Sequence, residues 1–547
     1  MIEKLKSAGD QLRAAWENYY HVYSTIDDSY NQGKSPHGCG FSLEVSRQLD
    51  AELAFISSYE PKIQQIKAAI SCARNHSSSL SPINTLPPEV LTRVFQLVAE
   101  QPCKLHLRAG DQLQAPFPRY PDYLAHVCSH WRRTAISCCS LWRHIDLSTY
   151  APWYKGLNAR AETHIARTNG LPIELHISDH VNQHSKKAKH EEDLVKLVSR
   201  ISTRTETLKF VVTDPFRHFH ESVLTKLLLS RSLILTELVV TSEIYHWDNF
   251  ILADKPSNQP PVPGSQSFRL GLWEDQLERC FAPLTVLCLR GIFPLWSSAA
   301  YQGLVDLRLL STTIWSHIQE VELVTILKSS PELRILHFGL KIENLSDNVS
   351  PVHLKDLRVI KIFPENGEKT RQCPSSLLRL LAPGPNPLRL SFSNCYEPNM
   401  TMLTELDNFF ERSRVAWFYS RGVFPPINLL LRHAVTLERV VLDDLKTYCS
   451  DELPFTWLRM DGLHTLPRLK SLRIRGSTLS VDELHLLVEC CPSGIVLQSC
   501  DVENDICSEW FSSTAFSSEE FNDTFLNVKI MDRNPSMDST IDWDILD

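Results

Sequence analysis

His126, Cys128 and His130 are the first residues along the chain whose types and spacing could bind a metal ion. A zinc site needs three or four nitrogen, sulfur or oxygen ligands that converge on one point. On a helix, residues i and i+4 share a face while residue i+2 points away, so this triplet offers two ligands at most. The adjacent cysteine pairs at 138–139 and 490–491 are poorly placed to chelate one ion and indicate buried thiols. We therefore expect no metal site and no cofactor.

Residues that could carry catalysis are dispersed. The chain has no glycine-rich phosphate loop, no Gly-x-Ser-x-Gly and no His-Glu-x-x-His. His218 and His220 flank Phe219 in a polar turn, and carboxylates occur as exposed pairs such as Asp27–Asp28. We expect the protein not to be an enzyme. The alternative is a catalytic site assembled from residues distant in sequence, which would form a cleft with converging polar groups.

Composition and charge narrow the class of partner. The 547 residues, 43% of them hydrophobic, leave room for about two to four domains with a large core. The net charge of −8 argues against a nucleic-acid backbone as the main ligand. There are 15 cysteines without a Cys-x-x-Cys pair, the N-terminus lacks a signal-peptide core, and no apolar run reaches about 18 residues. These features predict a reducing compartment, the cytoplasm or the nucleus, and no membrane span.

Residues 1–80 have the pattern of a helical hairpin. Gly33 to Gly40 is rich in Gly, Pro and His and is typical of a turn between two helices. Pro61 is expected to kink or interrupt the second helix. That helix carries part of a heptad stripe, formed by Leu49, Leu53, Ile56, Ile63 and Ile70. We expect the hairpin to pack on the next domain, with a coiled-coil dimer as the alternative.

Residues 83–147 predict two short helices with unusually broad apolar faces. Pro87-Pro88 begins the first helix, and Glu89 in its first turn complements the helix dipole. Its apolar face consists of Val90, Leu91, Val94, Phe95 and Val98, and that of the second helix consists of Leu124, Val127, Cys128, Trp131 and Ala135. Faces of this width mark a partner site, or they pack against the neighbouring parts of the same chain.

This segment resembles an F-box. The opening Leu86-Pro87-x-Glu89-Val90-Leu91, followed by Val94-Phe95, is similar to the first half of that motif, and Val127-Cys128-x-x-Trp131-Arg132 with Leu141-Trp142 is similar to the second half. The helical N-terminus ahead of it further resembles the F-box-like proteins of mushroom-forming (basidiomycete) fungi. The chain departs from the common form at Gln101 to Pro121, an insert between the two helices that puts docking on a ligase in doubt.

The resemblance implies a partner. An F-box binds a Skp-type adaptor and through it a cullin-based (SCF-type) ubiquitin ligase. Trp131 would be the best single anchor, because large aromatic side chains dominate interface energetics. The residues implied at the adaptor interface, or shared between it and the core of the domain, are Leu86, Pro87, Val90, Leu91, Val94, Phe95, Leu124, Val127, Cys128, Trp131, Leu141 and Trp142.

Residues 150–500 contain recurring Leu-x-x-aliphatic-x-aliphatic segments. They begin at Leu235, Leu284, Leu304, Leu333, Leu357, Leu437 and Leu469, and an irregular one is expected near PLRLSF. A helix and a Pro-bearing turn precede the strands LRILHF and GIVLQS, which is the unit of a leucine-rich repeat. The resemblance is to irregular repeats, since the Asn expected after the strand motif is missing. The alternative is an α/β domain without repeat order.

These observations predict an α+β multidomain protein. A helical region (1–80) is followed by a small all-α F-box-like domain (81–149), an α/β leucine-rich-repeat-like solenoid (150–500) and an acidic tail (501–547). The expected function is that of a substrate-recognition adaptor of an SCF-type ubiquitin ligase, which binds target proteins through its repeats. The alternative is an interaction scaffold with a degenerate F-box. Side chains near the strands that could face a target are Arg290, Arg308, Arg334, His337, Arg358, Lys361, Asp443, Asp444, Arg473 and Arg475.

Overall fold

A computed structural model describes most of the chain in two compact units. One unit comprises residues 1–91 and 128–130, and the other comprises residues 92–127 and 131–547. The described residues are 2–32, 43–75, 80–99, 121–179, 187–212, 216–229, 234–242, 249–254, 266–312, 316–346, 349–363, 374–393, 400–421, 427–433, 435–443, 469–491, 494–503, 525 and 527–531. The expected turn at 33–40, most of the insert at 101–121 and most of the tail fall outside these ranges.

The first unit is built from two long helices, α1 (Ile2–Gln32) and α2 (Leu43–Asn75), followed by the short helix η1 (Pro82–Thr85). The hydroxyl of Tyr19 on α1 donates to Glu52 on α2 over 3.0 Å. Helix α2 continues through Pro61, so of the expected kink or interruption the interruption does not occur. Most of the heptad stripe is exposed, including Leu53 and Ile63.

Helix α3 (Pro88–Ala99) starts at the paired prolines, with Glu89 in its first turn as expected. Three further helical segments follow it along the chain: α4 (Asp122–Val127), α5 (Ser129–Ser137) and η2 (Cys139–Trp142). The expected second helix is therefore divided between α4 and α5. Within the second unit these segments lead directly into the first strand of a large sheet.

The second unit is dominated by a parallel sheet of 14 strands. Every strand pairs with the next main strand along the chain, so the order in the sheet follows the sequence from end to end. The strands are β1 (His144–Ser148), β2 (Ile173–Asp179), β3 (Thr205–Val212), β4 (Glu237–Ser242), β7 (Val286–Arg290), β9 (Asp306–Leu310), β11 (Ile335–Gly339), β14 (Val359–Ile362), β16 (Leu388–Ser393), β17 (Val415–Arg421), β18 (Arg439–Asp443), β19 (Leu472–Arg475), β21 (Ile495–Gln498) and β23 (Val528–Met531).

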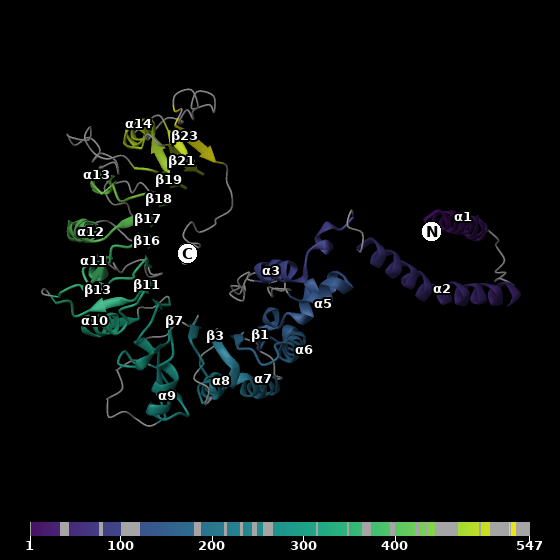
Figure 1. Cartoon of the computed structure of the whole chain (residues 1–547), viewed down its shortest axis with the longest axis horizontal. Coiled ribbons are helices and arrows are strands. Elements are labelled where there is room, and N and C mark those ends of the chain that lie inside the picture. Colours follow the sequence, from purple (N-terminus) through teal and green to yellow (C-terminus); the bar gives the residue numbers. More distant parts are fainter. Residues whose placement is uncertain are drawn as a thin grey trace. The chain divides into compact units, whose positions relative to one another are not determined.

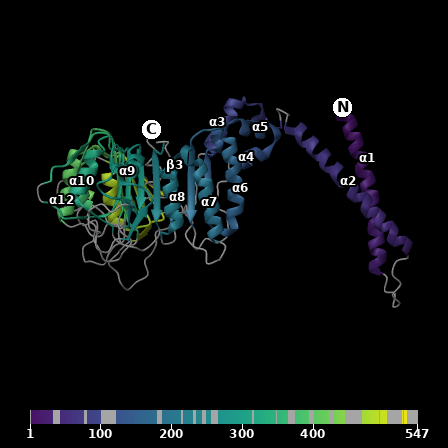
Figure 2. The ribbon, with the colours of Figure 1, turned by 90° about the horizontal axis from the view of Figure 1, so that it is seen from below.

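Parallel neighbours need crossover connections, and here helices supply most of them. The helices are α6 (Ala151–Arg167), α7 (Lys187–Ile201), α8 (His218–Leu228), α9 (Glu274–Phe281), α10 (Glu320–Ser329), α11 (Pro374–Leu378), α12 (Met400–Arg412), α13 (Ile427–Arg432) and α14 (Val481–Cys490). They lie on the outer side of the curved sheet, whose strands form the inner side (Figure 1). Figure 2 shows α6, α7 and α8 side by side along the sheet.

Short strands form a second row of parallel pairs beside the main sheet. These pairs join β10 (His317–Gln319) to β12 (Lys341–Glu343), β13 (Val352–Leu354) to β15 (Leu381–Pro383), and β20 (Thr478–Ser480) to β22 (Asp501–Glu503). A group of three contains β5 (Asn249–Ala253), β6 (Gln266–Leu270) and β8 (Phe293–Pro294). Strand, short strand and helix thus succeed one another several times.

The core lies between the sheet and its helices, because alternate residues of each strand point to that side. The strand register places fully buried aliphatic residues next to one another, as in the row formed by Leu287, Leu307, Leu336, Ile360 and Leu390. One continuous cluster extends from Ile145 to Val528. Each such side chain contributes about 1.5–3 kcal/mol through burial. Neighbouring strands therefore stabilise one another along the whole sheet.

The expected strands are confirmed. Each predicted Leu-x-x-aliphatic segment from Leu235 to Leu469 leads into a main strand, PLRLSF forms β16, and GIVLQS forms β21. The sheet also continues beyond residue 500 through β23, within the segment that we expected to be a tail. The protein thus combines helices and strands around a large parallel sheet. None of the described helices is both long and apolar enough to cross a membrane.

Candidate docking helix and polar face of the sheet

Helix α3 carries two apolar stripes that differ in exposure. Leu91 and Phe95, four residues apart, are fully buried. Val90, Val94 and Leu97, at i, i+4 and i+7, form the neighbouring stripe, with Val94 half-buried and the other two 46% and 54% exposed. Residues with this spacing share one face of a helix. The broad apolar face predicted from the sequence is therefore two stripes: an inward stripe of Leu91 and Phe95 and an outward stripe of Val90, Val94 and Leu97.

The inward stripe is buried, and Phe95 packs in an aromatic core. The rings of Phe95 and Trp131 lie 4.9 Å apart, and Trp131 is half-buried. Trp142 is fully buried, and its indole N–H donates to the carbonyl of Ala135 over 2.8 Å. The Arg167 guanidinium lies 4.1 Å from the Trp142 ring centroid. These contacts assign structural roles to several of the side chains that we predicted near a partner.

The predicted partner-binding residues consequently fall into three groups. Leu91, Phe95, Leu124, Leu141 and Trp142 are buried; Leu86, Val94, Cys128 and Trp131 are half-buried; Pro87, Val90 and Val127 are exposed. Leu97 and Ile136 are exposed apolar side chains that the prediction did not include. Leu97 stands seven residues after Val90, so helical spacing in the sequence could have placed it on the same face. Ile136, near the end of α5, carried no such signal.

The polar face of the sheet is the face opposite the core. Asp146, His176 and Lys209 stand at one level on β1 to β3, and the strand register continues this level through Arg308, His337 and Lys361. Of the side chains that we predicted near a target, those on this face are Arg290, Arg308, His337, Lys361, Asp443, Arg473 and Arg475. Arg334 and Arg358 directly precede strands, and Asp444 lies outside the described residues.

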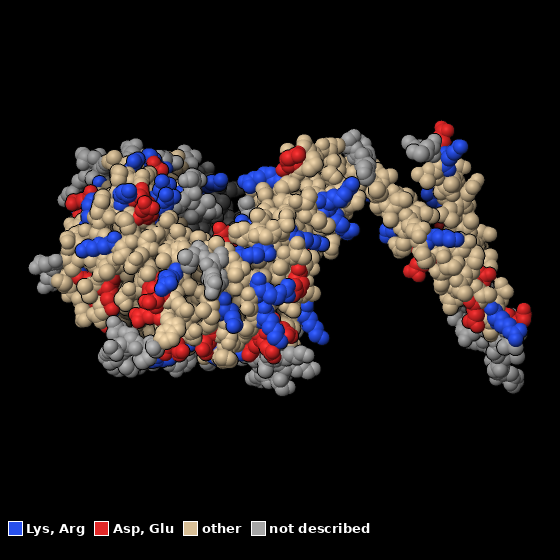
Figure 3. All heavy atoms as spheres, turned by 60° about the horizontal axis from the view of Figure 1, so that its bottom comes forward, with Lys and Arg blue, Asp and Glu red and all other residues tan. Residues whose placement is uncertain are grey.

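Strands β16 to β19 give this face a basic and aromatic character. Trp417 on β17 lies between two guanidinium groups, with Arg389 at 4.5 Å and Arg439 at 5.6 Å from its ring centroid. The Tyr419 hydroxyl donates to Asp443 over 2.8 Å. Because β19 adds Arg473 and Arg475, arginines outnumber this carboxylate among the described side chains here. On the face drawn in Figure 3, by contrast, basic and acidic side chains are intermingled.

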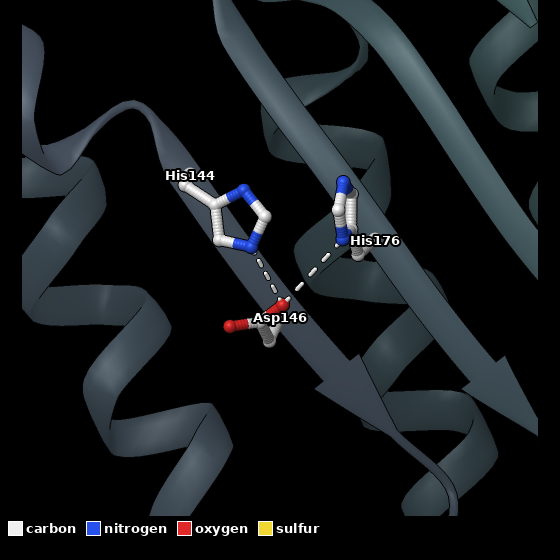
Figure 4. A group of neighbouring side chains, drawn as sticks. All are labelled: His144, Asp146 and His176. Carbon is white, nitrogen blue, oxygen red and sulfur yellow. Dashed lines mark hydrogen bonds and ion pairs between the residues drawn. The ribbon is translucent and has the colours of Figure 1, made fainter. Parts of the chain in front are cut away.

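At the other end of the sheet, β1 and β2 bring two imidazoles to one carboxylate (Figure 4). His144 Nε2 lies 2.8 Å from Asp146 Oδ1, and His176 Nδ1 lies 3.7 Å from the same oxygen. Burial alone would raise the pKa of Asp146, but the hydrogen bond from His144 and the nearby positive groups lower it to about 2. The carboxylate is therefore an ionised acceptor at neutral pH. Sequence reasoning missed this group because strand register alone brings residues 144–146 and 176 together.

A second carboxylate, Asp179 at the end of β2, is enclosed completely. It accepts hydrogen bonds from Thr149, His220 and Arg217 over 2.6, 2.9 and 2.7 Å. Arg217 also pairs with Glu191. Burial by itself raises the pKa of Asp179, while these donors lower it to about 2. The hydroxyl of Thr149 thus serves as a donor that stabilises the ionised carboxylate.

The triplet His126, Cys128 and His130, which we set aside as a metal site, does not lie on one continuous helix. His126 is exposed at the end of α4, and Cys128 lies between the two helices, so the three residues do not continue along one helix. Among the described residues, His144, Asp146 and His176 are the group whose potential ligand atoms all lie within 4.8 Å of one another. The sequence matches no protein-family model and no curated protein. Function must therefore be argued from these surfaces.

Proposed function

We propose that the protein is a substrate-recognition adaptor without catalytic activity of its own. Helix α3 would dock on a Skp-type adaptor of a cullin-based ubiquitin ligase, and the polar face of the sheet would hold a target protein. The observation that carries this proposal is the outward apolar stripe of α3, formed by Val90, Val94 and Leu97, beside the buried stripe of Leu91 and Phe95.

The outward stripe has the chemistry of a partner site. A helix on the surface of a globular protein normally buries its one apolar stripe and presents polar residues elsewhere. Exposed apolar side chains at i, i+4 and i+7 are the anchors by which a helix is laid into a groove of a partner. The F-box resemblance gives that partner a class, because Val90 and Val94 stand at positions where the motif is apolar.

The sheet supplies the second half of the proposal. Parallel strands in chain order, with helices on the outer side, support a leucine-rich-repeat-like solenoid with an extended inner face. On that face, Trp417 is flanked by Arg389 and Arg439. Aromatic and arginine side chains carry most of the binding energy at many protein interfaces. A target held there would meet the ubiquitin-transfer machinery at a high effective concentration.

The test is capture of a Skp-type adaptor by the full-length protein. Val90→Asp and Leu97→Asp place a charge on the outward stripe, where both side chains are already exposed, and each should reduce capture at least tenfold without lowering the melting temperature. Val321→Asp, on the 72% exposed Val321 of α10, is the matched control and should leave capture unchanged. Leu91 and Phe95 are unsuitable, since charges at these buried positions would unfold the segment. An unaltered protein that captures no adaptor ends the proposal.

The burial of five of the twelve predicted motif residues favours one alternative. Leu91, Phe95 and Trp142 are already enclosed by the chain's own residues, which leaves fewer side chains for a partner. The protein would then be an interaction scaffold with a degenerate F-box. In that case the full-length protein binds targets through the face around Trp417, and binding is lost with Trp417→Ala, but no Skp-type adaptor accompanies the complex.

A further inference from the structure

The group of His144, Asp146 and His176 has a donor set that suits a transition-metal ion. It combines two imidazole nitrogens with one carboxylate oxygen, and all three atoms lie within 4.8 Å of one another. Two imidazoles with one carboxylate, together with an open coordination position, form a common ligand set of catalytic zinc sites. Imidazole favours Zn²⁺ and similar ions over Mg²⁺ and Ca²⁺, which prefer oxygen ligands alone.

The separations also suit such an ion. Zinc bonds to histidine nitrogen and carboxylate oxygen are about 2.0–2.2 Å, so two ligands of a tetrahedral ion stand about 3.3–3.5 Å apart. The distances from Asp146 Oδ1 to His144 Nε2 and to His176 Nδ1 are 2.8 and 3.7 Å, on either side of that value. Binding would therefore replace the hydrogen bond between His144 and Asp146, with rotation of the partly exposed His144 side chain.

Surrounding groups provide the outer shell that metal ligands need. A histidine ligand is usually oriented by a carboxylate at its other ring nitrogen. Glu174 Oε2 lies 3.8 Å from His144 Nδ1, the nitrogen that faces away from Asp146 Oδ1. Arg160 approaches the second oxygen of Asp146 at 3.4 Å, and its own charge is balanced by Asp122 at 2.6 Å. Asp146 and Glu174 together then offset the charge of a divalent ion.

The backbone fixes the three ligands before any ion arrives. Strands β1 and β2 are adjacent, with His144 opposite Glu174 and Asp146 opposite His176. The side chains of Asp146 and His176 are 1% and 7% exposed, whereas that of His144 is 26% exposed and gives access from solvent. We propose that His144, Asp146 and His176 bind a divalent transition-metal ion, with Zn²⁺ as the best match, and that this ion clamps β1 to β2 at the first edge of the sheet.

The experiment uses the full-length protein stripped with a chelator and titrated with Zn²⁺ and with Co²⁺ as a spectroscopic probe. One Zn²⁺ should bind per chain, and the melting temperature should rise with Zn²⁺ concentration, because an ion that binds only the folded state stabilises it by mass action. The Co²⁺ complex should show d–d absorption without the charge-transfer bands of thiolate ligands. This readout separates the proposed site from zinc bound by any of the 15 cysteines.

Variants assign the site. His144→Asn and His176→Asn should each weaken Zn²⁺ binding at least a hundredfold and remove the increase in melting temperature. Glu174→Gln, in the outer shell, should weaken binding about 10–100-fold. His353→Asn, on an exposed histidine of β13, is the matched control, and His126→Asn, on an exposed histidine of α4, is a second control. Both should bind Zn²⁺ as the unaltered protein does.

Two results would overturn the proposal: an unaltered protein that binds no Zn²⁺ in competition with a weak chelator, or a folded His144→Asn protein that binds Zn²⁺ with unchanged affinity. In either case the group is a carboxylate that accepts a hydrogen bond from His144 and lies 3.7 Å from the imidazole of His176. His144 is partly exposed, so its replacement by Asn should leave the metal-free melting temperature within a few degrees of the original. If His176→Asn does not fold, protection of His144 by Zn²⁺ against a histidine-modifying reagent gives the same decision in the unaltered protein.

Discussion

The two ends of the sheet place their polar strand residues in different surroundings. At β1 and β2, Asp146 and Asp179 are buried and surrounded by donors on several sides. At β16 to β19, cationic side chains stack on Trp417, and Asp443, which pairs with Tyr419 and Arg475, keeps 18% of its side chain exposed. A polar strand residue is therefore not by itself a sign of binding. Polar groups that satisfy one another stabilise the fold, while those that stay near solvent can serve recognition.

We call the β1–β2 end of the sheet, where Asp179 is enclosed, the closed end, and the β16–β19 end the open end. The largest effect is expected at the closed end. Asp179→Asn should lower the free energy of unfolding by about 3–5 kcal/mol, because it leaves the half-buried Arg217 and the fully buried His220 beside a neutral amide. Denaturant unfolding of the full-length protein measures this change. The matched replacement at the open end, Asp443→Asn, should lower it by about 1 kcal/mol or less. Equal effects at the two positions would remove the distinction between the ends.

The pH dependence of stability sharpens the same distinction. The pKa of Asp179 is lowered to about 2 in the folded state, against an ordinary value near 3.9 in the unfolded chain. A carboxyl with a depressed folded pKa contributes stability above its unfolded pKa and loses it as the pH falls through its folded pKa. The contribution, on the order of 2–3 kcal/mol, should therefore be complete above about pH 5 and decline from pH 4 to pH 2.

The measurement is the free energy of unfolding of the unaltered protein minus that of Asp179→Asn, followed from pH 6 to pH 2. The subtraction cancels the pH-dependent contributions of the other titratable groups, including Asp146, His144 and His176. A difference that stays constant over this range would mean that Asp179 contributes no more as an ionised group than as a neutral one, and the closed end would owe its stability to packing.

The sequence predicted the strands of the sheet better than it predicted the residues of the candidate sites. The recurrence of leucine predicted the strands that follow Leu284, Leu304 and Leu333, because each places alternate aliphatic side chains in the core. The leucine pattern did not predict strand β17. Its sequence VAWFYSR carries aromatic side chains on both faces, with Phe418 buried in the core and Trp417 on the polar side.

The sites were harder to predict for geometric reasons. His176 lies 30 residues after Asp146, and only the parallel register of β1 and β2 makes them neighbours. On α3, hydrophobicity alone does not distinguish Val90 from Leu91, although the first is exposed and the second is fully buried. Which stripe faces inward depends on tertiary packing, so the width of the apolar face was predictable and its division was not.

The smallest effect concerns the stacked arginines at the open end. A double-mutant cycle with Trp417→Ala and Arg389→Ala should give a coupling free energy of about 0.5–1 kcal/mol, the range for a cation over an indole ring near solvent. Arg389→Lys should recover only part of it, because lysine lacks the planar guanidinium that stacks on the ring. Arg473, two strands further along the sheet, serves as the control partner and should show no coupling with Trp417. A coupling above 2 kcal/mol would mean that the stack is desolvated like the groups around Asp179. The side chains at the open end would then stabilise the fold and would not be available to bind a target.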